Sequence, residues 1–102
     1  MLRLIKVTGD SLYPEYQNGD FVITSKIPVL FGTLKAGDVV VFSRQPYGLL
    51  IKRIDHIDDR GSRYYVLGTH LHSTDSRVFG SIDRRDILGK VIYHARNRSH
   101  AT

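Results

Sequence analysis

A serine in a tight turn is the first side chain of this sequence that could do chemistry. Ser11 follows Gly9 and Asp10 and precedes Pro14 by three residues, a setting that exposes a hydroxyl. Serine in such a turn is more often a capping residue than a nucleophile, because a nucleophile needs a base beside it. None of the five histidines stands in a recognisable hydrolase motif. A base would have to come from another residue type.

Lys52 could be that base, since it alternates with aliphatic residues. In the expected strand 49–57, alternation puts Lys52 on the same face as Leu50 and Ile54. Apolar burial can lower the pKa of a lysine from about 10.4 by some three units, which would leave a neutral, basic amine near neutrality. The commoner explanation of the pattern is a lysine that reaches solvent from a partly buried strand or guards a sheet edge.

A polar stretch over residues 68–80 is long for a loop in so short a chain, and such loops are usually functional or disordered. It contains Ser73, Asp75 and Arg77. An aspartate and an arginine two residues apart can pair and fix the loop, and a nearby hydroxyl can then orient a lysine amine. Taken alone, the stretch is typical of a well-hydrogen-bonded loop.

Length and composition exclude several classes of function. The 102 residues have room for one domain, expected over 1–102 with a flexible basic tail from about residue 95. The absence of cysteine excludes a disulfide framework, a thiolate zinc site and a cysteine nucleophile. No apolar run approaches the roughly 20 residues of a membrane-spanning helix, and the first residues lack the apolar core of a secretory signal. We therefore expect a soluble, cytoplasmic protein.

Hydrophobic periodicity predicts an all-β, mostly antiparallel fold with little helix. Short runs rich in Val, Ile, Tyr and Phe are bounded by turn residues about every ten positions. Short helical turns are expected only at 13–16 and 83–87. The turns 17–20 and 35–38 both end in Gly-Asp before a strand. The expected strands are 2–7, 21–25, 39–43, 49–57, 64–67 and 88–94.

Together these segments resemble the serine/lysine-dyad peptidases, which include type I signal peptidases and the self-cleaving domains of SOS-response repressors. The resemblance covers most of the chain, and it is closest to small soluble members such as the maturation proteases of nickel-type superoxide dismutase. Five motifs in the family's order carry it: Gly9-Asp10-Ser11-Leu12-Tyr13-Pro14, Asn18-Gly19-Asp20-Phe21-Val22, Gly37-Asp38-Val39-Val40-Val41-Phe42, Ile51-Lys52-Arg53-Ile54 and Ser73-Thr74-Asp75-Ser76-Arg77-Val78-Phe79-Gly80.

The resemblance implies a coiled β fold of the signal peptidase type and a serine endopeptidase without cofactor or metal. Ser11 matches the nucleophile, and Lys52 matches the general base that takes the hydroxyl proton and returns it to the leaving amine. The backbone N–H groups of Asp10 and Ser11 match the oxyanion hole. The implied partner is a protein or peptide precursor bound in extended form, with a small residue before the cut.

The resemblance also implies supporting residues, and the sequence departs from the family at four positions. Ser73 matches a serine that holds the lysine amine, and Asp75 and Arg77 match a structural ion pair. Leu12 replaces the usual methionine, which nearly conserves volume. The tripeptide Gly68-Thr69-His70 stands where the family has Gly-Asp-Asn, and Gly9 cannot supply the hydroxyl that some signal peptidases have there.

Three alternatives remain open from the sequence. His70 and His72, with His56 or His94, could ligate a metal, although a His-x-His pair is frequent by chance. A small basic β module could bind nucleic acid or peptide, since the net charge is +5 and arginines and a lysine gather near the C-terminus. A peptidase fold without activity could bind peptides as an added strand. The sequence does not set the oligomeric state.

Overall fold

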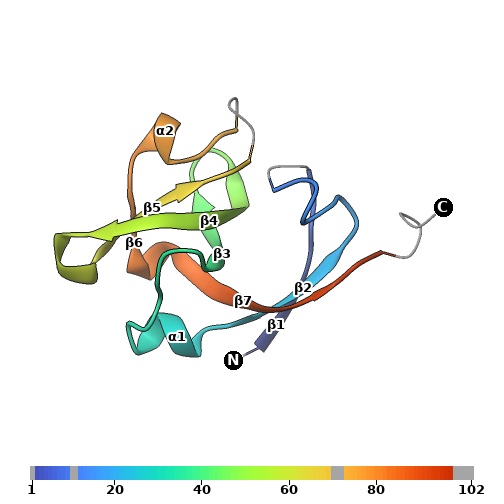
Figure 1. The fold of residues 1–102 in the computed structure, drawn as a ribbon, viewed down its shortest axis with the longest axis horizontal. Helices are drawn as coiled ribbons and strands as arrows, with labels where there is room; N and C mark the ends of the chain where they lie inside the picture. The colour runs from blue at the N-terminus through green and yellow to red at the C-terminus, as the bar shows by residue number, and fades with distance from the viewer. Residues whose placement is uncertain (1, 10–11, 70–72, 98–102) are drawn as a thin grey trace.

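The computed structural model describes residues 2–9, 12–69 and 73–97 and shows seven antiparallel strands in one coiled sheet, in the order β1-β2-β7-β3-β4-β5-β6 (Figure 1). The all-β fold with little helix is thus confirmed. The strands are β1 (Leu2–Lys6), β2 (Phe21–Ser25), β3 (Val39–Arg44), β4 (Gly48–Asp58), β5 (Arg63–Leu67), β6 (Ile82–Asp83) and β7 (Ile87–Ala95).

The short helical segments add detail that periodicity does not carry. They are α1 (Ile27–Leu30), α2 (Ser76–Phe79) and the 3-10 turns η1 (Asp59–Gly61) and η2 (Arg84–Asp86). The turn expected at 83–87 is η2, and the turn expected at 13–16 is closed by the Tyr16 N–H, which donates to the carbonyl of Leu12 at 3.1 Å. The strand β6 escapes sequence reasoning because two residues are too few to show an alternation.

Strand β7 joins the two halves of the sheet, β1–β2 on one side and β3–β6 on the other (Figure 1). Residues 90–95 pair with β2, and residues 87–90 pair with β3. Glycine is required where the halves meet, because a Cβ on Gly89 would lie 2.9 Å from Cβ of Thr24. The strand can bend through this point only because Gly89 has no side chain.

Two turns of the same chemistry lead into β2 and β3. The carboxylate of Asp20 accepts from the Gln17 N–H at 3.0 Å, and that of Asp38 accepts from the Lys35 N–H at 3.0 Å. In both turns the glycine before the aspartate has a positive φ, +94° and +96°. The recurrence of Gly-Asp in the sequence therefore reflects two copies of one turn.

Buried side chains form two clusters, and the adjacent residues Val39 and Val40 belong to different ones, so both faces of β3 are covered. The larger cluster contains Val29, Leu34, Val40, Phe42, Ile54, Tyr64, Val66, Ile82 and Ile87. The smaller contains Val7, Leu12, Tyr16, Val22 and Val39.

Within the described ranges, no helix is long and apolar enough to cross a membrane.

At the start of the segment expected to be a flexible tail, the chain is still ordered by contacts. Ala95 is the last residue of β7, and the Asn97 N–H donates to the Asp20 carboxylate at 2.9 Å. Residues 98–102 lie outside the described residues.

Candidate active site

Lys52 is buried in the middle of the sheet, with 2% of its surface exposed. It lies in β4 opposite Val40 of β3, and its neighbours on the same face, Leu50 and Ile54, pack in the larger core cluster. Strand β4 runs between β3 and β5, so Lys52 is not at an edge. Both structural explanations of the pattern, a lysine reaching solvent and an edge guard, are therefore wrong. An amine in this setting is unusual and needs a chemical reason.

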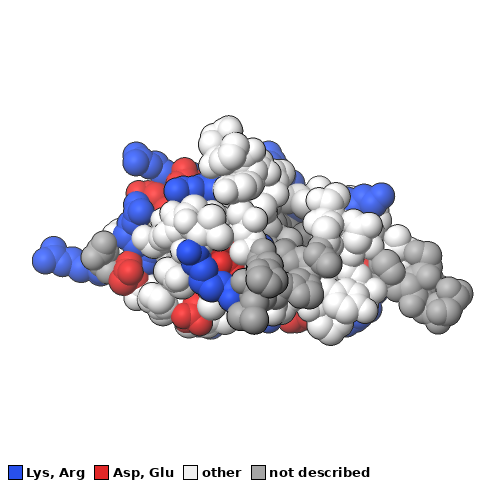
Figure 2. Space-filling view, turned by 90° about the horizontal axis from the view of Figure 1, so that it is seen from above, with Lys and Arg blue, Asp and Glu red and all other residues white. Residues whose placement is uncertain are grey.

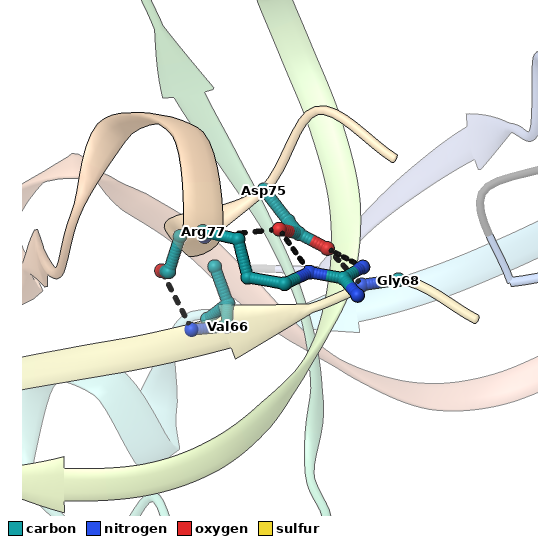
Figure 3. Close-up of polar contacts among 5 residues, drawn as sticks. Val66, Gly68, Asp75 and Arg77 are labelled. Carbon is teal, nitrogen blue, oxygen red and sulfur yellow. Dashed lines mark hydrogen bonds and ion pairs between the residues drawn. The ribbon is translucent and has the colours of Figure 1, made fainter. Parts of the chain in front are cut away.

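The loop after β5 is held by a buried carboxylate (Figure 3). Asp75 is fully buried, and its oxygens lie 2.6 Å from Nη2 and 3.0 Å from Nε of Arg77. The Gly68 N–H donates to the same carboxylate at 2.8 Å. Burial alone would raise the pKa of Asp75, but the hydrogen bonds from Arg77 and Gly68 outweigh it and lower the pKa. The ion pair that the sequence suggested is present and closes the loop upon itself.

A second contact ties this loop to β5. The Ser76 hydroxyl accepts from the Val66 N–H at 2.8 Å, and both groups are buried. Asp75 also caps α2, because its carboxylate accepts from the Arg77 N–H at 3.0 Å. Since Leu67 pairs with Arg53 of β4, the loop begins directly beside the strand that carries Lys52.

The Ser73 hydroxyl is buried and, among the described residues, it is the one buried side-chain polar atom without a hydrogen-bond partner. A hydroxyl left in this state costs about 1–3 kcal/mol. Such a cost is common where a group awaits a substrate or a catalytic partner.

Asp10 and Ser11, the expected nucleophile and oxyanion-hole residues, lie outside the described residues. The segments on either side of them are well anchored. The Gly9 N–H donates to Oδ1 of Asn18 at 3.1 Å. On the other side, Leu12 is 2% exposed and packs in the smaller core cluster. The chain on both sides of Ser11 is therefore fixed to the sheet.

A cavity of about 380 Å³ brings the three sequence segments together. Leu12 follows Ser11, Arg53 follows Lys52, and Thr69 lies in the segment that leads to Ser73. The full lining is Leu12, Gly37, Arg53, Ile54, Asp55, Leu67, Gly68 and Thr69. Leu12 and Arg53, which are 41 positions apart in the sequence, thus line the same cavity.

Two contacts made by residues that line this cavity, Arg53 and Thr69, were not predicted from the sequence. Nη2 of Arg53 lies 2.7 Å from Oε1 of Glu15, and the Thr69 hydroxyl donates to the carbonyl of Tyr13 at 2.8 Å. Thr69 stands at the position where the family has aspartate, and here it bonds to the segment that follows Ser11. No pattern in the sequence signals either contact, because each joins residues 38 or more positions apart.

The described histidines pair with carboxylates. Nδ1 of His56 lies 2.8 Å from Asp55, and Nε2 of His94 lies 2.8 Å from Asp20. The residues that the structure describes hold no group of three metal-ligating side chains. His70 and His72 lie outside these residues.

Basic side chains are interspersed with acidic ones. On the face drawn in Figure 2, red carboxylates lie among the blue basic residues. Lys90 lies 3.4 Å from Asp38, and both Arg63 and Arg85 approach Asp83. At these pairs, the positive charges lie next to negative ones.

The structure thus has a coiled antiparallel sheet, with a buried lysine in β4 and a loop after β5 that Asp75 and Arg77 close. The family model for signal peptidase, peptidase S26, matches residues 1–55, more than half of the chain. The chain therefore belongs to the signal peptidase family. Signal peptidase I V of Bacillus subtilis (strain 168) is 29% identical over 99 residues, covering 82% of this chain and 59% of that protein. The chain spans about three fifths of the length of this curated relative.

Proposed function

We propose that this protein is a serine endopeptidase in which Ser11 is the nucleophile and Lys52 is the general base. The observation that carries the proposal is the cavity where Leu12, which follows Ser11, Arg53, which follows Lys52, and Thr69, four residues before Ser73, meet. The family match supports it independently, because residues 1–55 include both members of the dyad. In this proposal, all the site residues belong to one peptidase domain over 1–102.

The proposed mechanism needs a neutral lysine amine. Burial of Lys52 among aliphatic side chains favours the uncharged form. The amine takes the proton of the Ser11 hydroxyl as its oxygen attacks the peptide carbonyl, and the backbone N–H groups of Asp10 and Ser11 stabilise the resulting oxyanion. The ammonium then gives the proton to the leaving amine, and the acyl-serine forms. Water, deprotonated by the same amine, releases the second product.

The supporting residues act on Lys52 through the loop. The Ser73 hydroxyl is buried with hydrogen-bonding capacity to spare, which suits a partner for the amine. Asp75 and Arg77 hold the loop that presents it. In this role they are positioning residues.

The proposed substrate is a protein or peptide precursor bound in extended form. Extended peptides commonly bind by pairing their backbone with a strand. An extended backbone also leaves the scissile bond accessible to the nucleophile. A small residue before the cut follows from the resemblance. The proposed enzyme needs no cofactor.

The test is a mass-spectrometric map of cuts in a diverse peptide pool between about pH 7 and 10, a range that includes a lowered lysine pKa. Wild type is compared with Ser11→Ala, Lys52→Met and Ser43→Ala, the last an exposed serine outside the cavity. We expect cuts from wild type and Ser43→Ala only. Cuts that persist in Ser11→Ala would overturn the dyad, and a folded wild type without any cut would favour a peptide-binding module.

A further inference from the structure

The cavity lined by Leu12 and Arg53, the residues that follow Ser11 and Lys52 in the sequence, has an apolar floor. Leu12 and Ile54 are buried, with 2% and 1% of their surfaces exposed, and Leu67 is partly buried at the end of β5. Together they offer aliphatic contacts to a side chain that enters the cavity. An apolar side chain would fit this floor. The cavity is also lined by two charged residues, Arg53 and Asp55, which form its rim.

The two charged residues of the rim differ in how they are neutralised. The Arg53 guanidinium is already occupied, because it donates to Oε1 of Glu15 at 2.7 Å and to the carbonyl of Gly37 at 3.2 Å. The Asp55 carboxylate lies 2.8 Å from Nδ1 of His56, and no lysine or arginine among the described residues pairs with it. Of the two charged side chains of the rim, Asp55 is therefore the one without a guanidinium or ammonium partner in the described part of the chain.

The position of Asp55 has a structural cause. The register of β4 against β5 shifts between Ile54 and His56, a β-bulge at Asp55. Bulges insert a residue and redirect the side chains beside them, and they are frequent next to active sites. Here the bulge leaves Asp55 at the cavity and half exposed, at 50% of its side-chain surface.

We propose that this cavity is a substrate subsite that accepts a lysine or arginine side chain, with its aliphatic stem on the floor and its cation beside Asp55. Long basic side chains bury their methylenes on apolar surface while the charged end stays in contact with water, which matches a floor and rim of this kind. The inference rests on the proposed peptidase function, because a peptide cut at the dyad passes the cavity. Because Leu12, which lines the cavity, directly follows Ser11 in the sequence, the basic residue would stand close to the scissile bond.

Binding can be measured apart from cleavage. The probes are alanine hexapeptides with one lysine, or one Nε-acetyllysine of nearly the same length, at each of the six positions. They are titrated into Ser11→Ala protein, followed by the amide signals of Gly68 and Thr69 in NMR spectra. At one position we expect lysine to bind roughly two- to five-fold more tightly than acetyllysine, the range expected of a half-exposed ion pair. The preference should weaken as salt is added.

The variant that tests the subsite is Ser11→Ala/Asp55→Asn, for which the lysine preference should fall to about one-fold. Its matched control is Ser11→Ala/Asp58→Asn, since Asp58 is exposed on the same strand and does not line the cavity. Equal binding of both probes, no binding at millimolar concentration, or a preference that survives Asp55→Asn would each overturn the subsite. Failure of the dyad would show instead in the peptide-pool map, as cuts that persist in Ser11→Ala, and that readout is separate from these titrations.

Discussion

The Glu15 carboxylate and the Arg53 guanidinium meet at 2.7 Å and join the segment after Ser11 to the strand that carries Lys52. Arg53 also donates to the carbonyl of Gly37, so it holds a third segment at the same point. The side chains of Glu15 and Arg53 are 49% and 37% exposed. An ion pair this exposed contributes little to stability. Its main effect is therefore to hold the connected segments in position.

Replacing Glu15 by Gln should therefore affect turnover more than folding. We expect a change in the free energy of unfolding below about 1 kcal/mol, and a roughly ten-fold fall in kcat with little change in KM, because small displacements of reacting groups are costly. Urea unfolding and steady-state kinetics on one peptide measure both. Arg85→Gln is the control, since Arg85 pairs with Asp83 at an exposed site away from the cavity. If the variant lost so much free energy of unfolding that the unfolded fraction explained the whole fall in kcat, Glu15 would act only through stability.

Replacing Lys52 by Met should abolish activity without unfolding the protein. Methionine is unbranched and of similar length, so it can fill the space among Val40, Leu50 and Ile54. Since a buried amine is replaced by an apolar group, we expect stability to stay equal or rise. Peptidase activity should fall by at least about a thousand-fold. Normal turnover by a folded Lys52→Met protein would contradict the proposed mechanism.

The sequence predicts the fold better than it predicts the contacts of the site. Alternation over residues 49–57 correctly placed Lys52 on the buried face, because a strand buried on one side imposes a period of two. The Asp75–Arg77 pair was also predictable, since the partners are two residues apart. The Glu15–Arg53 and Tyr13–Thr69 contacts were not, because they depend on how distant segments pack. That Ser11 lies next to Lys52 is a prediction from the family resemblance.

Asp20 should make folding stability depend on pH in acid. Burial alone would raise its pKa, but hydrogen bonds from the Asn97 and Gln17 N–H groups and from His94 lower it from 3.8 to about 2. A carboxyl with a lowered pKa in the folded state contributes stability above its unfolded pKa, and that contribution is lost as the pH falls through the folded value. The contribution is about 2 kcal/mol at neutral pH and should disappear between about pH 4 and pH 2.

Urea unfolding of wild type and Asp20→Asn across this range measures the effect. The two proteins should differ most above about pH 4 and converge near pH 2. Asp58→Asn, an exposed carboxylate, provides the control and should follow wild type throughout. A difference between wild type and Asp20→Asn that is constant with pH would show that the charge of Asp20 has no part in its effect.

Asp75 should matter more than its partner Arg77, because their exposures differ. Asp75 is fully buried, whereas the Arg77 side chain is 34% exposed. In Asp75→Asn, an amide N–H₂ group would face the guanidinium, and one or more donors now satisfied by the carboxylate would lose their acceptor. We expect this change to lower the free energy of unfolding by about 3 kcal/mol. Arg77→Met should cost less, because the carboxylate keeps the Gly68 and Arg77 backbone N–H groups as donors.

The pH dependence separates loss of charge from loss of packing. Because the pKa of Asp75 is lowered in the folded protein, its contribution is present above the unfolded pKa and is lost as the pH falls below about 4. The stability gap between wild type and Asp75→Asn should therefore narrow in acid, and urea unfolding at pH 7 and pH 3 measures it. Activity should fall in both variants, since each loosens the loop that carries Ser73. An Arg77→Met protein less stable than Asp75→Asn would reverse the assignment and make the guanidinium the main anchor of the loop.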